Sequence, residues 1–94
     1  MSEIDQAFFD RADEHINLSN KQLVYASMGK VSASMMYSVA RFNAWVSAAG
    51  WNSGIEMEEA IGETLEHYLI EYKKMLKENL EDYAKNFEYY KNAK

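Results

Sequence analysis

The segment from Val31 to Ala49 constrains the fold most, because it carries a single charged side chain, Arg41. Its larger apolar residues recur every three or four positions, as along one face of a helix. A second row, of mostly small residues, runs beside the first. The rows are Val31, Met35, Val39, Phe42, Val46 and Ala49, and Ala33, Met36, Ala40, Ala44 and Ser47. A helix that is apolar nearly all round is buried on several sides, so we expect a helix over 32–49 that needs cover from more than one neighbour.

A preceding helix is predicted over residues 3–26. Ser2, followed three positions later by Asp5, fits an N-cap with an acidic third position. One apolar stripe then continues through the segment: Ile4, Phe8, Ala12, Ile16, Ser19 and Leu23. Gly29 is expected to provide the left-handed residue that follows the end of this helix.

A long third helix is predicted over 56–90, after a turn formed by Gly50–Gly54. Its apolar positions keep a mean step of about 3.6 residues, and Gly62 is its weakest point. At about 1.5 Å per residue, this helix would be roughly 50 Å long and would extend beyond its neighbours. Its last apolar residues would then be left in water, which monomers rarely tolerate for a large patch.

These patterns predict an all-α single domain over 1–94, a three-helix up-down bundle with a long C-terminal helix. The surplus apolar surface on the second and third helices further predicts a homo-oligomer, most simply a two-fold dimer. The residues expected at its interface are Met36, Ala40, Ala44, Tyr83, Phe87 and Tyr90.

Composition narrows the possible partners and the compartment. The formal net charge of -5 and the scattered lysines and arginines argue against nucleic acid, which is bound by clustered basic residues. The absence of cysteine fits a reducing cytoplasm and leaves no thiolate metal site. No long apolar run and no basic leader with an apolar core occur, so we expect neither membrane insertion nor a cleaved signal.

Catalytic and metal-binding motifs are not found. His67 lies four residues from both Glu63 and Glu71, and His15 follows two acids, yet neither histidine has the Glu-x-x-His spacing of di-iron bundles. No nucleophile elbow and no phosphate-binding glycine loop occur. We therefore predict no catalytic residue, no metal and no cofactor.

Arg41 is the polar residue most in need of explanation. A guanidinium buried on an apolar helix must be paired, because loss of its partner costs about 3–5 kcal/mol. Its candidate partners are acids of the flanking helices: Asp13, Glu14, Glu66 and Glu71. Neighbouring amides would extend the pair into a polar cluster: Asp13, Asn17, Asn20, Arg41 and Asn43. A structural ion pair is favoured over an anion-binding or catalytic role.

Three motifs in order carry a family resemblance: Ala12–Asn20, Val31–Ala33 leading into Ala40–Ala44, and Tyr72–Tyr83. Together they resemble a family of short, mainly proteobacterial proteins known as a domain of unknown function. The resemblance implies an all-helical cytoplasmic protein of about this length and leaves its activity open. It adds Asn79 and Asp82 to the polar positions of interest.

The function favoured by the sequence is a non-enzymatic, self-associating protein–protein interaction module. The alternative is a helical bundle that binds a small ligand or a metal through Arg41, His15, His67 and nearby carboxylates.

Overall fold

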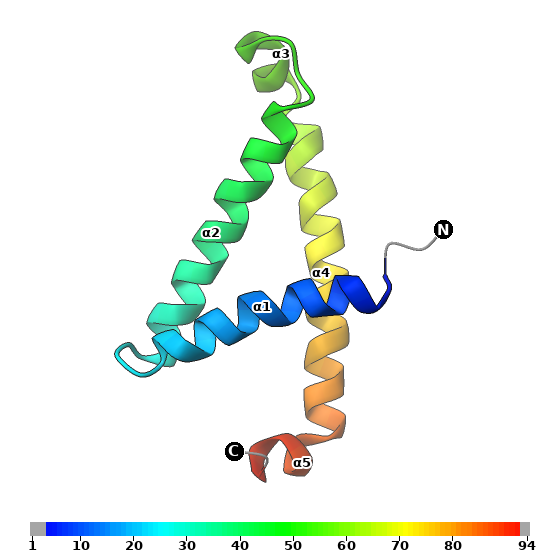
Figure 1. Ribbon diagram of the computed structural model, residues 1–94. Helices are drawn as coiled ribbons and strands as arrows, with labels where there is room; N and C mark the ends of the chain where they lie inside the picture. The colour runs from blue at the N-terminus through cyan, green and yellow to red at the C-terminus, as the bar shows by residue number, and fades with distance from the viewer. Residues whose placement is uncertain (1–3, 93–94) are drawn as a thin grey trace. The chain divides into compact units, whose positions relative to one another are not determined.

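A computed structural model describes residues 4–92 and confirms an all-α chain. Five helices and no strand occur in this range, so a three-helix bundle is not confirmed. The helices are α1 (Gln6–Gln22), α2 (Met28–Ala48), α3 (Gly54–Glu59), α4 (Ile61–Lys85) and α5 (Phe87–Asn92) (Figure 1). Within residues 4–92, no helix combines the length and the apolar character needed to cross a membrane.

Asp5 is the N-cap of α1. Its backbone is extended, and its carboxylate accepts a hydrogen bond of 2.9 Å from the backbone N–H of Phe8. Ser2, the predicted cap, lies outside the described residues. Sequence spacing placed Asp5 as the acid inside the first turn, whereas the structure uses it to satisfy one of the free amides at the helix start.

The boundary between α1 and α2 differs from the prediction. α1 ends at Gln22, four residues earlier than expected, and Gly29 lies inside the first turn of α2 rather than after α1. The signal that prevails is Ser27, whose hydroxyl accepts a hydrogen bond of 3.3 Å from the backbone N–H of Lys30. A serine in this position satisfies an amide that would otherwise have no partner, so α2 starts at Met28.

The single long helix predicted over 56–90 is wrong at two points. Ser53 caps the short helix α3, accepting a hydrogen bond of 3.2 Å from the backbone N–H of Glu56. The backbone of Ala60, with φ -94° and ψ 0°, then separates α3 from α4. This break lies two residues before Gly62, the position expected to be weakest. A second break at Asn86 ends α4 and is followed by α5.

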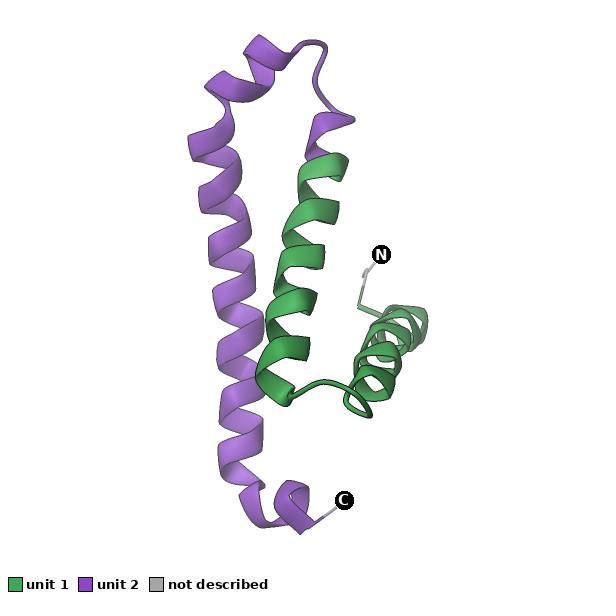
Figure 2. Cartoon of the chain, turned by 90° about the vertical axis from the view of Figure 1, so that its left-hand side faces the viewer, with its two compact units in different colours: residues 1–46 green, residues 47–94 purple. Residues whose placement is uncertain are grey.

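The chain forms two compact units, residues 1–46 and 47–94, and α2 crosses the boundary (Figure 2). In the first unit α1 contacts the N-terminal half of α2, where the Ser19 hydroxyl meets the Met35 sulfur at 3.7 Å. Val31, 7% exposed, is the one buried residue in the described range. In the second unit α4 contacts both α3 and α5. Whether 1–94 acts as one domain stays a prediction.

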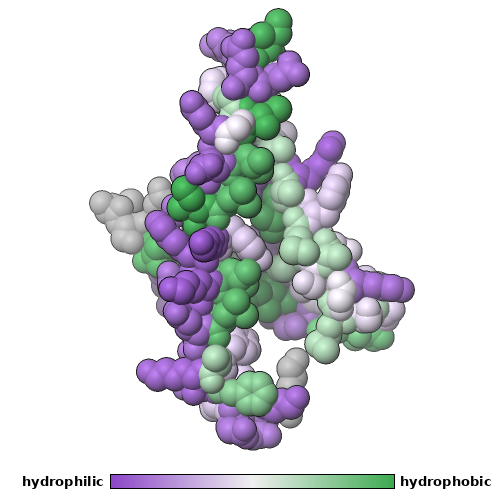
Figure 3. All heavy atoms as spheres, turned by 180° about the vertical axis from the view of Figure 1, so that it is seen from behind, coloured by the Kyte–Doolittle hydropathy of each residue, from purple (hydrophilic) through white to green (hydrophobic). Residues whose placement is uncertain are grey.

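Large apolar side chains are exposed on every helix, and apolar residues reach the surface among hydrophilic ones in Figure 3. The three with the largest exposed fractions are Val24, Tyr25 and Met28, at the junction of α1 and α2. Much of the apolar side-chain surface in the described range is therefore exposed.

The cap of α1 gives a direct test of the fold. Asp5→Ala removes the acceptor for the Phe8 amide and should lower the free energy of unfolding by about 0.5–2 kcal/mol. Asp13→Ala is the matched control, because Asp13 is exposed within the same helix and its carboxylate caps nothing. Urea unfolding followed by circular dichroism measures both, and equal effects of the two substitutions would contradict the assigned cap.

Candidate functional site

The second row of α2 forms a small apolar surface, which we call the α2 face and define as Met36, Ala40 and Ala44. All three residues are exposed, Met36 at 57%. At about 3.6 residues per turn, Ala40 lies half a turn away from Val31 and Met35, which occupy the side in contact with α1. The first unit therefore covers one side of α2 along its N-terminal half and leaves the opposite side exposed.

The side of α2 that contacts α1 is itself exposed along the C-terminal half of the helix. Val39, Phe42 and Val46 are 48%, 62% and 44% exposed, although they continue the row that begins at the buried Val31. Phe42 contacts Trp45 with ring centroids 5.6 Å apart, and Trp45 is itself 66% exposed. Such a surface offers two aromatic rings that a partner would cover, and aromatic residues are enriched in the buried centres of protein interfaces.

Arg41 is exposed beside these aromatics and makes no hydrogen bond or ion pair within residues 4–92. The partners predicted on the first helix, Asp13 and Glu14, are also exposed. Asn17 and Asn20 lie on α1 with exposed side chains, and Asn43 on α2 is half-buried. No side-chain hydrogen bond or ion pair joins these residues within residues 4–92, so the polar cluster stays a prediction.

The two histidines lie on different helices. His15 is exposed on α1, and His67 on α4 contacts the ring of its neighbour Tyr68, with centroids 5.5 Å apart. In the part of the chain that the structure describes, no group of three or more histidine and acidic side chains is placed to hold a metal ion. The candidate metal ligands are therefore not gathered there.

The C-terminal residues predicted for an interface contact each other. Tyr90 of α5 stacks on Tyr83 of α4, with centroids 4.0 Å apart and ring planes 20° from parallel. Asp82 accepts hydrogen bonds from the Asn86 amide at 2.9 Å and from the Tyr90 hydroxyl at 2.5 Å. Phe87 remains 56% exposed. Residues 82–90 thus form a C-terminal hook, in which Tyr83 and Tyr90 partly cover one another.

The hook perturbs one ionisable group. The hydrogen bond to Asp82 raises the pKa of Tyr90 to about 12, with smaller contributions from desolvation and from the carboxylate charge. Asp82, Asn86 and Tyr90 follow each other at intervals of four residues, a spacing that places them on one side of a helix. That spacing was visible in the sequence, but the uninterrupted apolar period through Phe87 masked the turn.

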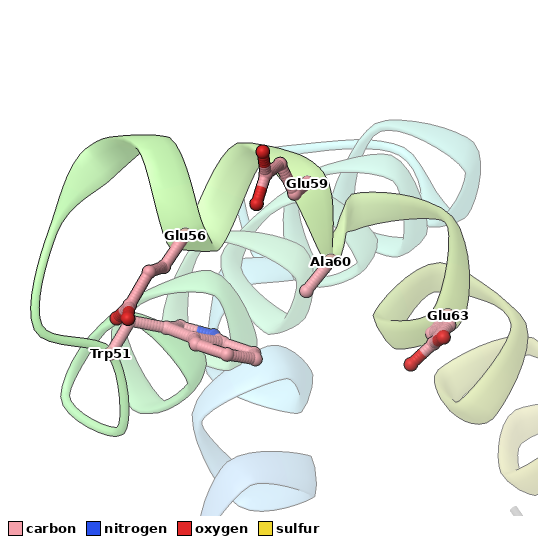
Figure 4. A pocket seen from close by; sticks show the side chains of 5 residues that line it. All are labelled: Trp51, Glu56, Glu59, Ala60 and Glu63. Carbon is pink, nitrogen blue, oxygen red and sulfur yellow. The ribbon is translucent and has the colours of Figure 1, made fainter.

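Sequence reasoning also missed an open concavity of about 260 Å³ at the junction of α3 and α4. It is lined by Trp51, Ala60 and three glutamates, Glu56, Glu59 and Glu63 (Figure 4). The Trp51 indole N–H donates to the Ser47 hydroxyl at 3.3 Å, and Glu56 accepts from the backbone N–H of Asn52 at 3.0 Å. The sequence signal that could have indicated this turn is Ser53 followed three residues later by Glu56, which is the spacing of a capping box.

The fold and these surfaces define a small all-helical protein with an exposed apolar second helix. Residues 8–84 match the family described as "Protein of unknown function (DUF3144)", and the chain belongs to this family, which confirms the resemblance seen in its motifs. It is similar over 99% of both chains to the NMR structure of the protein NB7890A from Shewanella sp., with 37% identity and a TM-score of 0.78. Comparison with curated proteins gives no match.

The hook predicts an alkaline transition. Because the folded pKa of Tyr90 is raised above its ordinary value of about 10, its hydrogen bond contributes stability fully below pH 10, and this contribution is lost as the pH rises through about 12. An ultraviolet titration of tyrosinate should show one tyrosine ionising last. Tyr90→Phe should remove that phase, whereas Tyr89→Phe should keep it. Loss of the late phase in the Tyr89 variant alone would refute the assignment.

Proposed function

We propose that this protein is a cytoplasmic, non-enzymatic module that associates with a second copy of itself through α2. The observation that carries the proposal is the α2 face, which is apolar and exposed on the side opposite to the α1 contact. A second observation is that Arg41 is the sole charged residue between Val31 and Ala48. Helices with so little charge are covered on several sides in stable folds.

Small residues suit such a contact. Ala40 and Ala44 lie one turn apart, so they permit another helix to approach closely along this side of α2. Covering the exposed 57% of Met36 would contribute about 1–2 kcal/mol. Association costs at least about 4 kcal/mol in lost translational and rotational freedom, so Met36 alone is insufficient. Tyr37, which is 67% exposed and lies beside Ala40 on the helix surface, supplies further exposed apolar area.

The structure changes what we expect of the C-terminal end. The sequence predicted Tyr83, Phe87 and Tyr90 as part of the interface, but Tyr83 and Tyr90 stack on each other within the hook. We therefore centre the proposed interface on α2 and assign the hook a secondary part, through the exposed Phe87.

Sedimentation-velocity ultracentrifugation at micromolar concentrations tests the proposal. We expect a species of twice the chain mass of 10.9 kDa. Ala44→Glu should weaken association at least tenfold, or about 1.4 kcal/mol, because it places an unpaired carboxylate in an apolar contact. The matched control is Ala7→Glu, which makes the same change at an exposed alanine of α1. A monomeric natural chain, or equal effects of the two substitutions, would refute the proposal.

A further inference from the structure

Charge is strongly segregated along the chain. Residues 15–55 contain no aspartate or glutamate and carry the positive charges of Lys21, Lys30 and Arg41. Residues 56–71 show the reverse, with no lysine or arginine. Their six acids are Glu56, Glu58, Glu59, Glu63, Glu66 and Glu71. Whatever covers α2 therefore meets a weakly basic surface, and the adjoining acidic segment is its electrostatic complement.

Arg41 sets a requirement on any partner of α2. It is exposed, and at positions four residues to either side lie Tyr37 and Trp45, which are 67% and 66% exposed. A chain that covers these aromatic rings also removes water from the guanidinium. Arg41 makes no ion pair in residues 4–92, and an arginine buried without a partner is strongly destabilising. The partner surface must therefore bring a carboxylate to Arg41.

A symmetric contact of α2 with α2 does not meet this requirement. In a two-fold pair of antiparallel helices centred on Ala40, the same residue of each chain lies near the axis. Arg41 of one copy would then approach Arg41 of the other. Since no acid occurs anywhere in residues 15–55, neither copy of α2 could neutralise the pair.

The first turns of α4 do meet the requirement for a carboxylate opposite Arg41. Their apolar residues Ile61, Leu65 and Leu69 are 55%, 56% and 59% exposed. Three residues before Leu69, and beside it on the helix surface, Glu66 is exposed and makes no ion pair in the described range. Glu71, in contrast, already contacts Lys74 at 3.4 Å. This stretch of α4 thus offers apolar area and a free carboxylate together.

We infer that α2 of one copy docks on residues 61–71 of a second copy, with Arg41 facing Glu66. The inference rests on the proposed self-association and specifies its geometry: in a two-fold dimer the contact forms twice, because each chain provides both surfaces. Apolar contacts between Ala44 or Tyr37 and Leu65 or Leu69 supply area, and the ion pair selects the register.

Charge reversal tests this contact. Arg41→Glu and, separately, Glu66→Arg should each weaken self-association at least about tenfold. An equimolar mixture of the two should restore a dimer that contains one chain of each kind. The chain that carries both substitutions should dimerise with itself, since both of its surfaces are reversed. Glu78→Arg, the same change at an exposed glutamate of the same helix, is the control and should dimerise normally.

Sedimentation velocity of the separate and mixed variants, with helix content checked by circular dichroism, distinguishes the outcomes. A natural chain that is monomeric refutes self-association itself. A dimer that no reversal affects refutes only the charge-paired contact. If the mixture stays monomeric while the doubly substituted chain regains stability as a monomer, Arg41 pairs with its own chain and the inference is wrong. Association in the mixture, absent from each variant alone, supports it.

Discussion

The structure depends on one constraint, the low charge of α2. A helix with apolar residues on opposite sides is stable in water only when both sides are covered. Within the first unit, α1 reaches Val31 and Met35 near the start of α2 and leaves Phe42, Val46 and the α2 face exposed. The apolar surface of α2 that could still be stabilised by burial therefore lies mainly outside the contact with α1.

Charge determines which surface can cover it. Apolar area by itself does not select a partner, because any exposed apolar helix face could cover α2. The absence of acids from residues 15–55 and of lysine and arginine from 56–71 gives the chain two segments of opposite charge. Like surfaces repel at Arg41, so the same charges that favour the unlike contact disfavour the symmetric one.

The sequence predicted the helical class well and the helix ends less well. Period-3.6 spacing located α1, α2 and α4, because their stripes are long and uninterrupted. Two signals compete within three residues at the start of α2: Gly29 as a terminator and Ser27 as an N-cap. The hydrogen bond from the Lys30 amide shows that Ser27 prevails. The breaks at Ala60 and Asn86 interrupt a continuous apolar period, so periodicity could not reveal them.

The candidate site was predictable only in part. The amino-acid sequence was enough to identify the α2 face and Arg41, because a single charged residue within an apolar helical segment can be recognised without a structure. The spatial relation of Arg41 to an acid depends on tertiary packing, and the acids expected on α1 do not pair with it in residues 4–92. The stacking of Tyr83 on Tyr90 likewise requires the turn at Asn86. The residue pattern did not predict this turn.

The most direct measurement is an isotope-filtered NOE experiment on an equimolar mixture of labelled and unlabelled chains. Such spectra report only proton pairs that belong to different molecules. We predict cross-peaks between the methyl groups of α2, at Ala40 and Ala44, and those of Ile61, Leu65 or Leu69 on the other chain. Filtered spectra without any intermolecular peak from α2, in a sample where the same α2 methyl groups show intramolecular contacts, would contradict the self-association proposed for this protein.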